Sequence, residues 1–398
     1  MRSLELSGIA LPNWAELALA NGPIFGSEIA GGVHTAGDDI HALVRSTADG
    51  ISLDQLWEDY RNLLSLVNQH RSAIVSHLSY VTTAAADAVP QSVEEIAVEE
   101  ASEFGEPKAA RPGSALLVGY TFKDYDIATR YTWRFLRDAN RQQIDHVTDS
   151  IVEAFNRNEA RQVLKRIMTP NEGLSPENNR VFGLWNGTDG LAPLPHLGKT
   201  FPDTTSHYWA SGNAVLDSSD IEDAIGAITV KGYGRRAGSR ILVFANATET
   251  DKIAGWQSGA ESRPGGSTAK FDFIPSADAP PYLTTKTIVG STAPADLDGL
   301  RIVGSYGDAW IIPTELIPAG YVLVVASAGQ NSPNNVLGYR QHPDAAYQGI
   351  KMIAGSGRYP LQDAFFTQSF GVGVRNRSAA VAIQITANAS YTAPTFPA

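Results

Sequence analysis

The spacing of apolar residues predicts two helices in the first half of the chain. From Ser52 to Val81, apolar positions recur every three or four residues, as on one face of a helix, and Ser52 is a suitable N-cap. A longer helix is predicted from its N-cap Asp138 to Met168, where Thr169-Pro170 ends it. Charges of both signs occupy its other faces, so we expect an amphipathic helix about 45 Å long.

The second half of the chain alternates short apolar runs with polar turns, which predicts a mixed α+β fold. The capping-box sequence Ser219-Asp-Ile-Glu222 predicts a helix to about Val230, and another is expected near Glu249–Ser258. Further apolar runs predict strands at 240–246, 300–305, 309–313, 321–326 and 347–353. The last two runs, 370–374 and 379–386, flank a short polar turn and predict a hairpin.

A charged segment stands between these two parts of the chain. Residues 91–113 carry six glutamates and then a basic, proline-containing stretch: Glu94, Glu95, Glu99, Glu100, Glu103, Glu106, Lys108 and Arg111. Such a long charged excursion is uncommon inside a compact domain. Ile96/Val98 and Leu116–Tyr120 predict two strand arms around its polar tip. We expect this segment either to be disordered or to lie on a neighbouring molecule.

Composition narrows the class of protein. Of the 398 residues, 43% are hydrophobic and 18% charged, which is enough apolar mass for a real core. The formal charge of −11 argues against non-specific nucleic-acid binding by the whole surface. The absence of cysteine excludes a disulfide scaffold, a thiol nucleophile and a cysteine-ligated metal. We find no signal peptide and no apolar run of membrane-spanning length, and we therefore expect an intracellular protein.

Motifs that carry chemistry are weak in this sequence. His34, Asp38, Asp39 and His41 form a set that zinc or iron could accept, but a polar loop explains them as well. The glycines from Gly232 to Gly238 lack the spacing and the preceding strand of a dinucleotide-binding motif. No nucleophile elbow or zinc-protease motif occurs. The sequence therefore predicts no assembled active site, no cofactor and no metal.

The remaining features of the sequence indicate a subunit that assembles with other copies of the chain. An arm over residues 1–50 with little periodic pattern, a projecting charged loop and a long helix are typical of a chain that depends on neighbours. Opposite charges on the loop and on the long helix would set the register between subunits. The candidate inter-subunit residues are Glu94, Glu95, Glu99, Glu100, Glu103, Glu106, Lys108, Arg111, Arg137 and Arg141.

The order of these elements resembles the major capsid proteins of tailed double-stranded DNA bacteriophages, whose fold is shared with encapsulins and the herpesvirus capsid floor. Residues 113–170, GSALLVGYTFKDY…LKRIMTP, are similar to a returning loop strand that runs into a spine helix. Residues 218–246, SSDIEDAIGAITVKGYGRRAGSRILVFAN, are similar to the start of an axial domain. Residues 363–386, DAFFTQSFGVGVRNRSAAVAIQIT, are similar to closing strands that return to the peripheral domain.

The resemblance implies an N-terminal arm, an extended β-hairpin loop, a peripheral domain with a long spine helix, and an axial domain. On this sequence the arm and helix span 1–90, the loop 91–127 and the peripheral domain 128–204. The axial domain spans 205–355, and the C-terminal strands that return to the peripheral domain span 356–398. In some members of the family a loop lysine forms an isopeptide bond with a neighbour. Lys108 or Lys123 would be that lysine here.

The implied function is structural, without enzymatic turnover. Hexamers and pentamers would build an icosahedral shell around the packaged double-stranded DNA genome, in the virion and, during assembly, in the bacterial host cytoplasm. The implied partners are further copies of the chain, portal, scaffolding and decoration proteins, and DNA in non-specific contact; no membrane is involved. Many relatives lose an N-terminal segment during maturation. Because this chain begins at Met1, we expect no such removal.

Two alternatives stay open at this point. An encapsulin-type nanocompartment would share the fold but enclose cargo enzymes rather than DNA. A metal-dependent α+β enzyme would use His34, Asp38, Asp39 and His41. Particle diameter and nucleic-acid content separate the first alternative, whereas a small oligomer with stoichiometric metal would identify the second.

Overall fold

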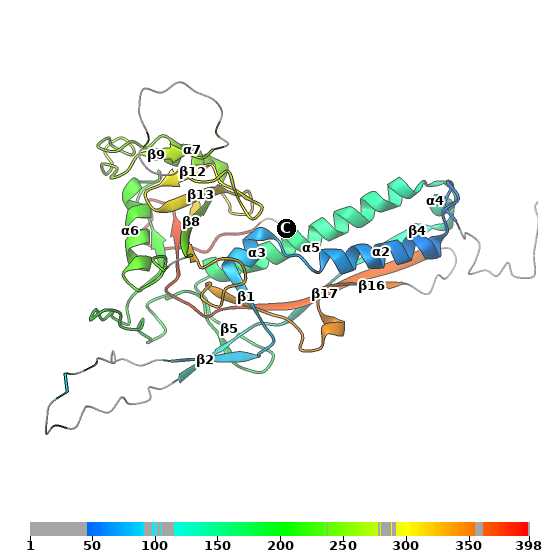
Figure 1. The fold of residues 1–398 in the computed structure, drawn as a ribbon, viewed down its shortest axis with the longest axis horizontal. Coiled ribbons are helices and arrows are strands. Elements are labelled where there is room, and N and C mark those ends of the chain that lie inside the picture. Colours follow the sequence, from blue (N-terminus) through cyan, green and yellow to red (C-terminus); the bar gives the residue numbers. More distant parts are fainter. Residues whose placement is uncertain are drawn as a thin grey trace, which may run out of the picture.

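The computed structural model describes residues 46–90, 115–236, 238–277, 292–354 and 361–396, with isolated positions at 98, 100, 101, 105, 279 and 288. Two sheets organise these residues (Figure 1). One sheet lies in a lobe with α6 (Ser218–Thr229) and α7 (Ala247–Ala254). The other runs beside the long helix α5 (Arg141–Met168) in an elongated arm. The mixed α+β fold predicted from the sequence is confirmed.

A seven-stranded sheet, which we call the lobe sheet, forms the centre of the lobe. Strand β8 is parallel to its neighbour β13 and antiparallel to its other neighbour β14. The predictions of strands at 240–246, 309–313 and 321–326 are confirmed. The strands follow the order β7 (Tyr208–Ala210), β18 (Ala380–Gln384), β14 (Tyr321–Ser327), β8 (Arg240–Ala245), β13 (Ala309–Pro313), β12 (Gly304–Tyr306) and β9 (Phe273–Pro275).

Both faces of the lobe sheet are buried at its central strands β18, β14 and β8. Val243 and Val324 pack into the hydrophobic cluster of α6 and α7, whereas their neighbours Phe244 and Leu323 pack into a second cluster with the end of α5. A strand buried on both faces has a continuous apolar sequence. Strand β8 has one, because every residue from Ile241 to its end is apolar and buried.

A five-stranded sheet, which we call the arm sheet, is built on one long strand. The first half of β17 (Leu361–Val374) lies between β4 (Lys123–Thr132) and β16 (Ile350–Ala354). Its second half pairs with β15 (Leu337–Arg340), which pairs in parallel with β1 (Ser79–Thr82).

Helices cover only one face of the arm sheet. Apolar side chains of α5 and α2 (Leu53–Val67) form one cluster with Tyr131 of β4 and Phe366 of β17. The side chains that alternate with these point to the opposite face, where Ile353 of β16 is 55% exposed. Arg130 of β4 is exposed on that face too. Exposed side chains mark this second face along β4, β16 and the first half of β17, whereas Tyr120 covers it at Gly338 and Gly373.

The first predicted helix is shorter than its sequence pattern indicates. Ser52 is its N-cap as predicted, since the backbone N–H of Gln55 donates to Ser52 Oγ at 3.2 Å. The prediction that the helix continues to residue 81 is wrong, because α2 ends at Val67, and α3 (Ala73–Leu78) and β1 follow. The side-chain amide of Asn68 exchanges two hydrogen bonds with the backbone of Ile350, at 2.7 and 2.9 Å, which draws the chain away from the helix axis.

The long helix begins later than predicted. A short helix, α4 (Trp133–Asp138), precedes it, so Asp138 ends one helix instead of capping the next. Asn140 is the N-cap of the 28-residue α5, and its backbone N–H donates to Gln143 Oε1 at 3.1 Å. The predicted end at Met168 is confirmed.

The cap of α6 is also shifted from the predicted position. Asp217 is the N-cap and Asp220 completes the capping box, where the sequence suggested Ser219 and Glu222. Glu222 instead accepts a hydrogen bond from Tyr306 at 2.6 Å. A long-range contact has therefore replaced the local one.

The predicted C-terminal hairpin is wrong. Strand β17 lies in the arm sheet and β18 in the lobe sheet, where β18 pairs with β14 and β7. The buried side chain of Arg377 fixes the crossing between them. Its guanidinium donates to the carbonyl oxygens of Gly183 and Leu184 and forms an ion pair with Asp189. Those contacts hold the connection against a different part of the chain, and the two strands do not turn back on each other.

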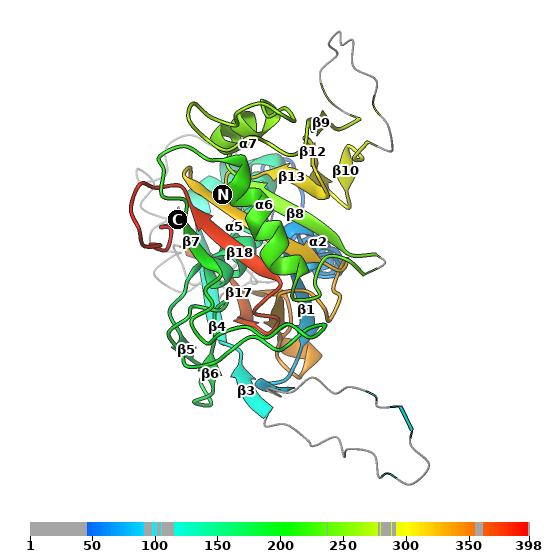
Figure 2. The ribbon, with the colours of Figure 1, turned by 90° about the vertical axis from the view of Figure 1, so that its left-hand side faces the viewer.

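A two-stranded hairpin projects from the body beside β1 (Figures 1 and 2). It pairs β2 (Ala86–Pro90) with β3 (Ala115–Gly119). The strand arm predicted at Leu116–Tyr120 is confirmed, but its partner is β2 rather than the pair Ile96/Val98. Ile96 lies outside the described residues, and Val98 has no strand pairing.

Small elements complete the fold. The run predicted as one strand at 300–305 is divided between two strands, and the start of the run predicted at 347–353 lies in a 3-10 turn. Among the described residues, no helix has both the length and the apolar character that crossing a membrane requires. The small elements are β5 (Gly173–Leu174), β6 (Arg180–Val181), β10 (Asp296–Leu297), β11 (Leu300–Arg301) and η2 (Ala345–Tyr347).

Candidate functional site

The structure describes three of the predicted inter-subunit residues. Glu100 is exposed. Arg137 pairs with Asp138 at 2.7 Å and Arg141 pairs with Asp59 at 2.9 Å, so both arginines have partners within their own chain near the start of α5. Their role between subunits stays a prediction. The others lie outside the described residues: Glu94, Glu95, Glu99, Glu103, Glu106, Lys108 and Arg111.

The residues of the metal hypothesis, His34, Asp38, Asp39 and His41, also lie outside the described residues. In the part of the chain that the structure describes, no three histidine or acidic side chains gather in a way that would hold a metal ion. The metal hypothesis therefore gains no support from the described part of the fold.

The root of the β2–β3 hairpin is held by two tyrosines and an aspartate. Asp87 Oδ2 accepts hydrogen bonds from Tyr80 at 2.8 Å and from Tyr120 at 2.7 Å, and the two phenol oxygens are 2.6 Å apart. Arg375 Nε lies 3.6 Å from the same carboxylate oxygen. Burial raises the pKa of Tyr80 to about 12 and that of Tyr120 further, so both phenols stay protonated and keep donating.

Glycines form a socket for one of these tyrosines. Tyr120 is fully buried, and its ring lies against Gly338 of β15 and Gly373 of β17. A Cβ atom at Gly338 would lie 2.4 Å from the ring, and one at Gly373 2.7 Å from it. Any larger residue would displace the ring, because heavy atoms cannot approach so closely. The socket and the hydrogen bonds together fix the direction in which the hairpin leaves the body.

A buried carboxylate links α5 to the arm sheet. Glu159 Oε1 accepts hydrogen bonds from the Tyr339 hydroxyl at 2.5 Å and from Gln368 Nε2 at 2.6 Å. Burial raises the pKa of Glu159, and the positive charge of Arg71 acts in the opposite direction. The Arg71 guanidinium lies 4.1 Å from the centre of the Tyr339 ring, in cation–π contact. These contacts join the α2–α3 connection, α5, β15 and β17.

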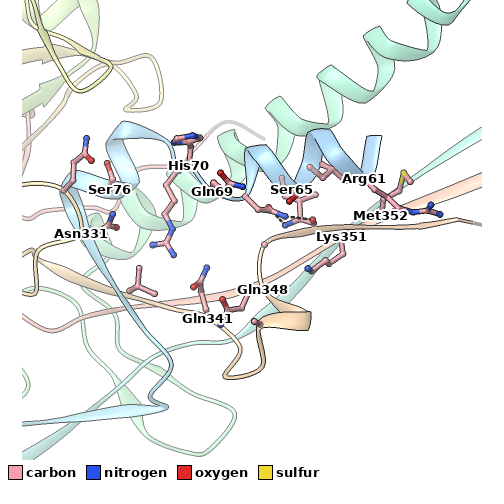
Figure 3. A pocket seen from close by; sticks show the side chains of 18 of the residues that line it. Arg61, Ser65, Gln69, His70, Ser76, Asn331, Gln341, Gln348, Lys351 and Met352 are labelled. Atoms are coloured by element: carbon pink, nitrogen blue, oxygen red, sulfur yellow. Dashed lines mark hydrogen bonds between the residues drawn. The ribbon is translucent and has the colours of Figure 1, made fainter. Parts of the chain in front are cut away.

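A polar hollow of about 830 Å³ opens where α2 approaches η2 and β16 (Figure 3). Arg61 of α2 and Lys351 of β16 both contribute to its lining. In the described lining, Asp298 is the single carboxylate, and it lies 3.2 Å from His77 Nε2. The rest of the polar lining consists of cationic, histidine and amide side chains: Arg71, His70, Asn68, Gln69, Gln330, Asn331, Gln341 and Gln348.

Sequence reasoning missed both the hairpin root and the hollow. The one signal for the root is the run Gly371-Val-Gly373, since glycines inside an apolar strand often mark a close approach of another part of the chain. The hollow has no local signal, because its cations come from α2, the α2–α3 connection and β16.

Comparison with known proteins gives the family. No family model matches the chain, and no curated protein matches it. A solved structure from Mycobacterium phage Patience is 34% identical with a TM-score of 0.68, over 93% of this chain and 97% of that chain. The capsid of an empty GTA particle (14% identity, TM-score 0.46, 80% of this chain and 91% of that chain) and the SrpI encapsulin of Synechococcus elongatus PCC 7942 (13%, 0.41, 98% and 100%) also match.

The two weaker matches have TM-scores below 0.5 and support no conclusion about this chain. The match to the Mycobacterium phage Patience structure extends over nearly the whole of both chains. The spine helix and the projecting hairpin that the resemblance implied are both present. The chain belongs to the family of major capsid proteins of tailed double-stranded DNA bacteriophages.

Proposed function

We propose that this capsid shell protein assembles as hexamers and pentamers into an icosahedral shell that encloses the packaged double-stranded DNA. The observation that carries the proposal is the 34% identity with a phage structure over 97% of that chain. The subunit's role is structural, and we assign it no catalytic step. The match to the SrpI encapsulin, at 13% identity and a TM-score of 0.41, is too distant to support the encapsulin alternative.

The shape of the subunit supports an assembly role. The β2–β3 hairpin leaves the body from a rigid root, yet Leu117 along its length is 57% exposed. Along β4, β16 and the first half of β17, the second face of the arm sheet exposes side chains such as the apolar Ile353. Contacts with neighbouring copies would bury both features, as subunit contacts do in closed symmetric assemblies.

The domain division follows the family pattern. We propose a peripheral domain over 128–204 and an axial domain over 205–355 with excursions into the peripheral domain, together with an N-terminal arm and helix over 1–90 and an extended loop over 91–127. Of the C-terminal strands in 356–398, β17 joins the arm sheet beside the spine helix, and β18 joins the lobe sheet. Portal, scaffolding and decoration proteins are the proposed further partners, with DNA in non-specific contact.

Imaging and sedimentation of the purified chain test the proposal. We expect closed particles of megadalton mass, and filled particles from infected cells should contain double-stranded DNA. Small empty shells around protein cargo would favour the encapsulin alternative. A compact monomer at all working concentrations would contradict both.

A deletion tests the part played by the loop. Removing residues 94–112 should leave the fold intact, because β2 and β3 pair with each other outside the deleted range. The variant should form no stable shells. Loss of folding in the unassembled variant would show that the loop belongs to the core of the subunit.

A further inference from the structure

The polar hollow beside α2 is lined by more cationic than anionic side chains, and two of its cations take no part in the contacts that hold the subunit together. Arg61 and Lys351 form no ion pair with any described residue, and Asp298, the one carboxylate of the described lining, lies 3.2 Å from His77 Nε2. Arg61 is exposed and Lys351 half-buried, so a binding partner can reach both cations. A hollow of about 830 Å³ lies within the size range of ligand sites, roughly 300–1,000 Å³.

Arg71 gives the hollow a fixed cation in its wall. Its guanidinium stacks on Tyr339, and Nη1 is buried without a hydrogen-bond partner among the described residues. A buried donor without an acceptor costs free energy, and a ligand that supplies an acceptor recovers it. The charges and this donor indicate an anionic ligand.

The lining favours an acidic peptide over a nucleic acid. Its described residues include no phenylalanine, tyrosine or tryptophan on which a base would stack. It does contain several asparagine and glutamine side chains, such as Gln341 and Gln348, which both donate and accept hydrogen bonds as a peptide backbone requires (Figure 3).

The chain itself contains a peptide of this chemistry. Between β2 and β3, residues 94–106 carry six glutamates and no basic residue. Among its described positions, Glu100 is exposed and Val98 is 99% exposed, so neither is covered by its own subunit. In both ribbon views, β2 and β3 lie at the margin of the molecule and are directed away from α2 (Figures 1 and 2). The geometry favours a hollow on another subunit.

We propose that the hollow binds the glutamate-rich segment 94–106 of a second copy of this chain, with Arg61, Arg71 and Lys351 facing its carboxylates. This inference rests on the proposed function and specifies the receptor for the loop. The sequence suggested that the loop glutamates contact Arg137 and Arg141, but both arginines have carboxylate partners within their own chain. The inference therefore assigns the glutamates to the cations of the hollow.

Charge reversal on each side tests the proposal in the full chain. One variant carries Arg61→Glu with Lys351→Glu, and a second carries Glu99→Lys with Glu100→Lys. Like charges across an interface oppose association, so the assembled fraction measured by sedimentation should fall about tenfold or more in each variant. Arg157→Glu with Lys165→Glu, two exposed positions on α5 outside the hollow, is the matched control and should assemble normally.

Mixing identifies the chain that supplies the segment. When the two reversed variants are mixed, the changed hollow can meet the changed segment, and the unchanged hollow the unchanged segment, only across the two variants, so the assembled fraction should rise above that of either variant alone. The variant with all four changes should also recover. Recovery of that variant without recovery in the mixture would place the segment in its own subunit's hollow and overturn the proposal.

Other outcomes are equally decisive. Normal assembly of both reversed variants would overturn the inference but leave the proposed function standing. Failure of the unmodified chain to form shells would instead overturn the proposed function. If Arg61→Glu with Lys351→Glu abolishes binding of double-stranded DNA fragments but not assembly, the hollow serves nucleic acid and the proposal is wrong.

Discussion

The lobe sheet and the arm sheet differ in how much of their surface the chain itself covers. Strand β8 of the lobe sheet is apolar from Ile241 onward and buries both of its faces. Strand β4 of the arm sheet alternates, with Thr129 and Tyr131 buried and Asp126 and Arg130 exposed. The first sheet therefore finishes its core within one subunit. The second leaves a face on which neighbouring copies can contribute, so stability and assembly depend on different parts of the molecule.

The largest expected effect is a loss of stability in the lobe sheet, whose strand β8 is buried on both faces. Phe244→Ala removes a fully buried ring from β8 and should lower the free energy of unfolding by about 3–5 kcal/mol. Its matched control is Phe365→Ala on the open face of β17, where we expect a loss of about 1 kcal/mol or less. Urea unfolding of the unassembled chain measures both. Equal losses would contradict the distinction between the two sheets.

Acid should weaken the lobe sheet through His207. This side chain is buried beside β18, its Nδ1 lies 2.6 Å from the carbonyl oxygen of Ala380, and burial together with the charge of Lys231 lowers its pKa to about 3. The unfolded chain binds a proton near the ordinary pKa of about 6.5. The free energy of unfolding should therefore fall as the pH drops from about 6.5 towards 3, by at most about 1.4 kcal/mol per pH unit.

The measurement is unfolding by urea across this pH range in the parent chain and in His207→Asn, whose amide can donate a similar bond but does not titrate. The variant should show a flatter dependence on pH. His146→Asn, at an exposed position on α5, is the control and should reproduce the parent profile. An unchanged slope in His207→Asn would show that this histidine is not the source of acid sensitivity.

A smaller effect separates the hairpin root from the lobe. Tyr120→Phe removes one hydrogen bond to Asp87, and Tyr306→Phe removes one to Glu222; both tyrosines are fully buried. Each should lower the free energy of unfolding by about 1–2 kcal/mol. Only Tyr120→Phe should speed hydrogen exchange at the amides of β2 and β3. Similar exchange in both variants would mean that the tyrosine cluster does not hold the hairpin.

The smallest effect on the subunit concerns the open face of the arm sheet. Ile353→Ser changes a residue that is 55% exposed and should alter the free energy of unfolding by about 0.5 kcal/mol or less. Shell formation should nevertheless decline, because a neighbour would lose an apolar contact. Leu174→Ser, at a residue 64% exposed outside the arm sheet, is the control. Equal shell yields from both variants would remove the open face from the assembly contacts.

Local patterns predicted much of the fold, but they failed where contacts between residues distant in sequence determine the structure. The apolar runs of β8, β13 and β14 predicted strands because burial on both faces leaves a continuous signal. The α2 helix was predicted too long, since the Asn68 side chain bonds the backbone of Ile350, 282 residues further along the chain. The C-terminal hairpin was predicted wrongly because Arg377 binds residues 183–189, which no local pattern reveals.

The functional surfaces were less predictable than the fold. The glutamate-rich segment is evident from composition, but the cations that we assign to it lie on α2, the α2–α3 connection and β16. They become neighbours only after the arm sheet has formed. Arg137 and Arg141 were predicted as inter-subunit residues from the sequence. Spacing alone does not show that carboxylates of the same chain, on Asp138 and Asp59, pair with them.

The passage of the chain from β17 into β18 has a mechanical consequence. One uninterrupted stretch of backbone pairs with β4, β15 and β16 in the arm and with β14 in the lobe. The ion pair of Arg377 with Asp189 holds the connection between them. A force that pulls the arm from the lobe must load covalent bonds and many strand hydrogen bonds at once. In a shell under internal pressure, tension between the arm and the lobe would therefore be carried by this continuous backbone and its strand pairings.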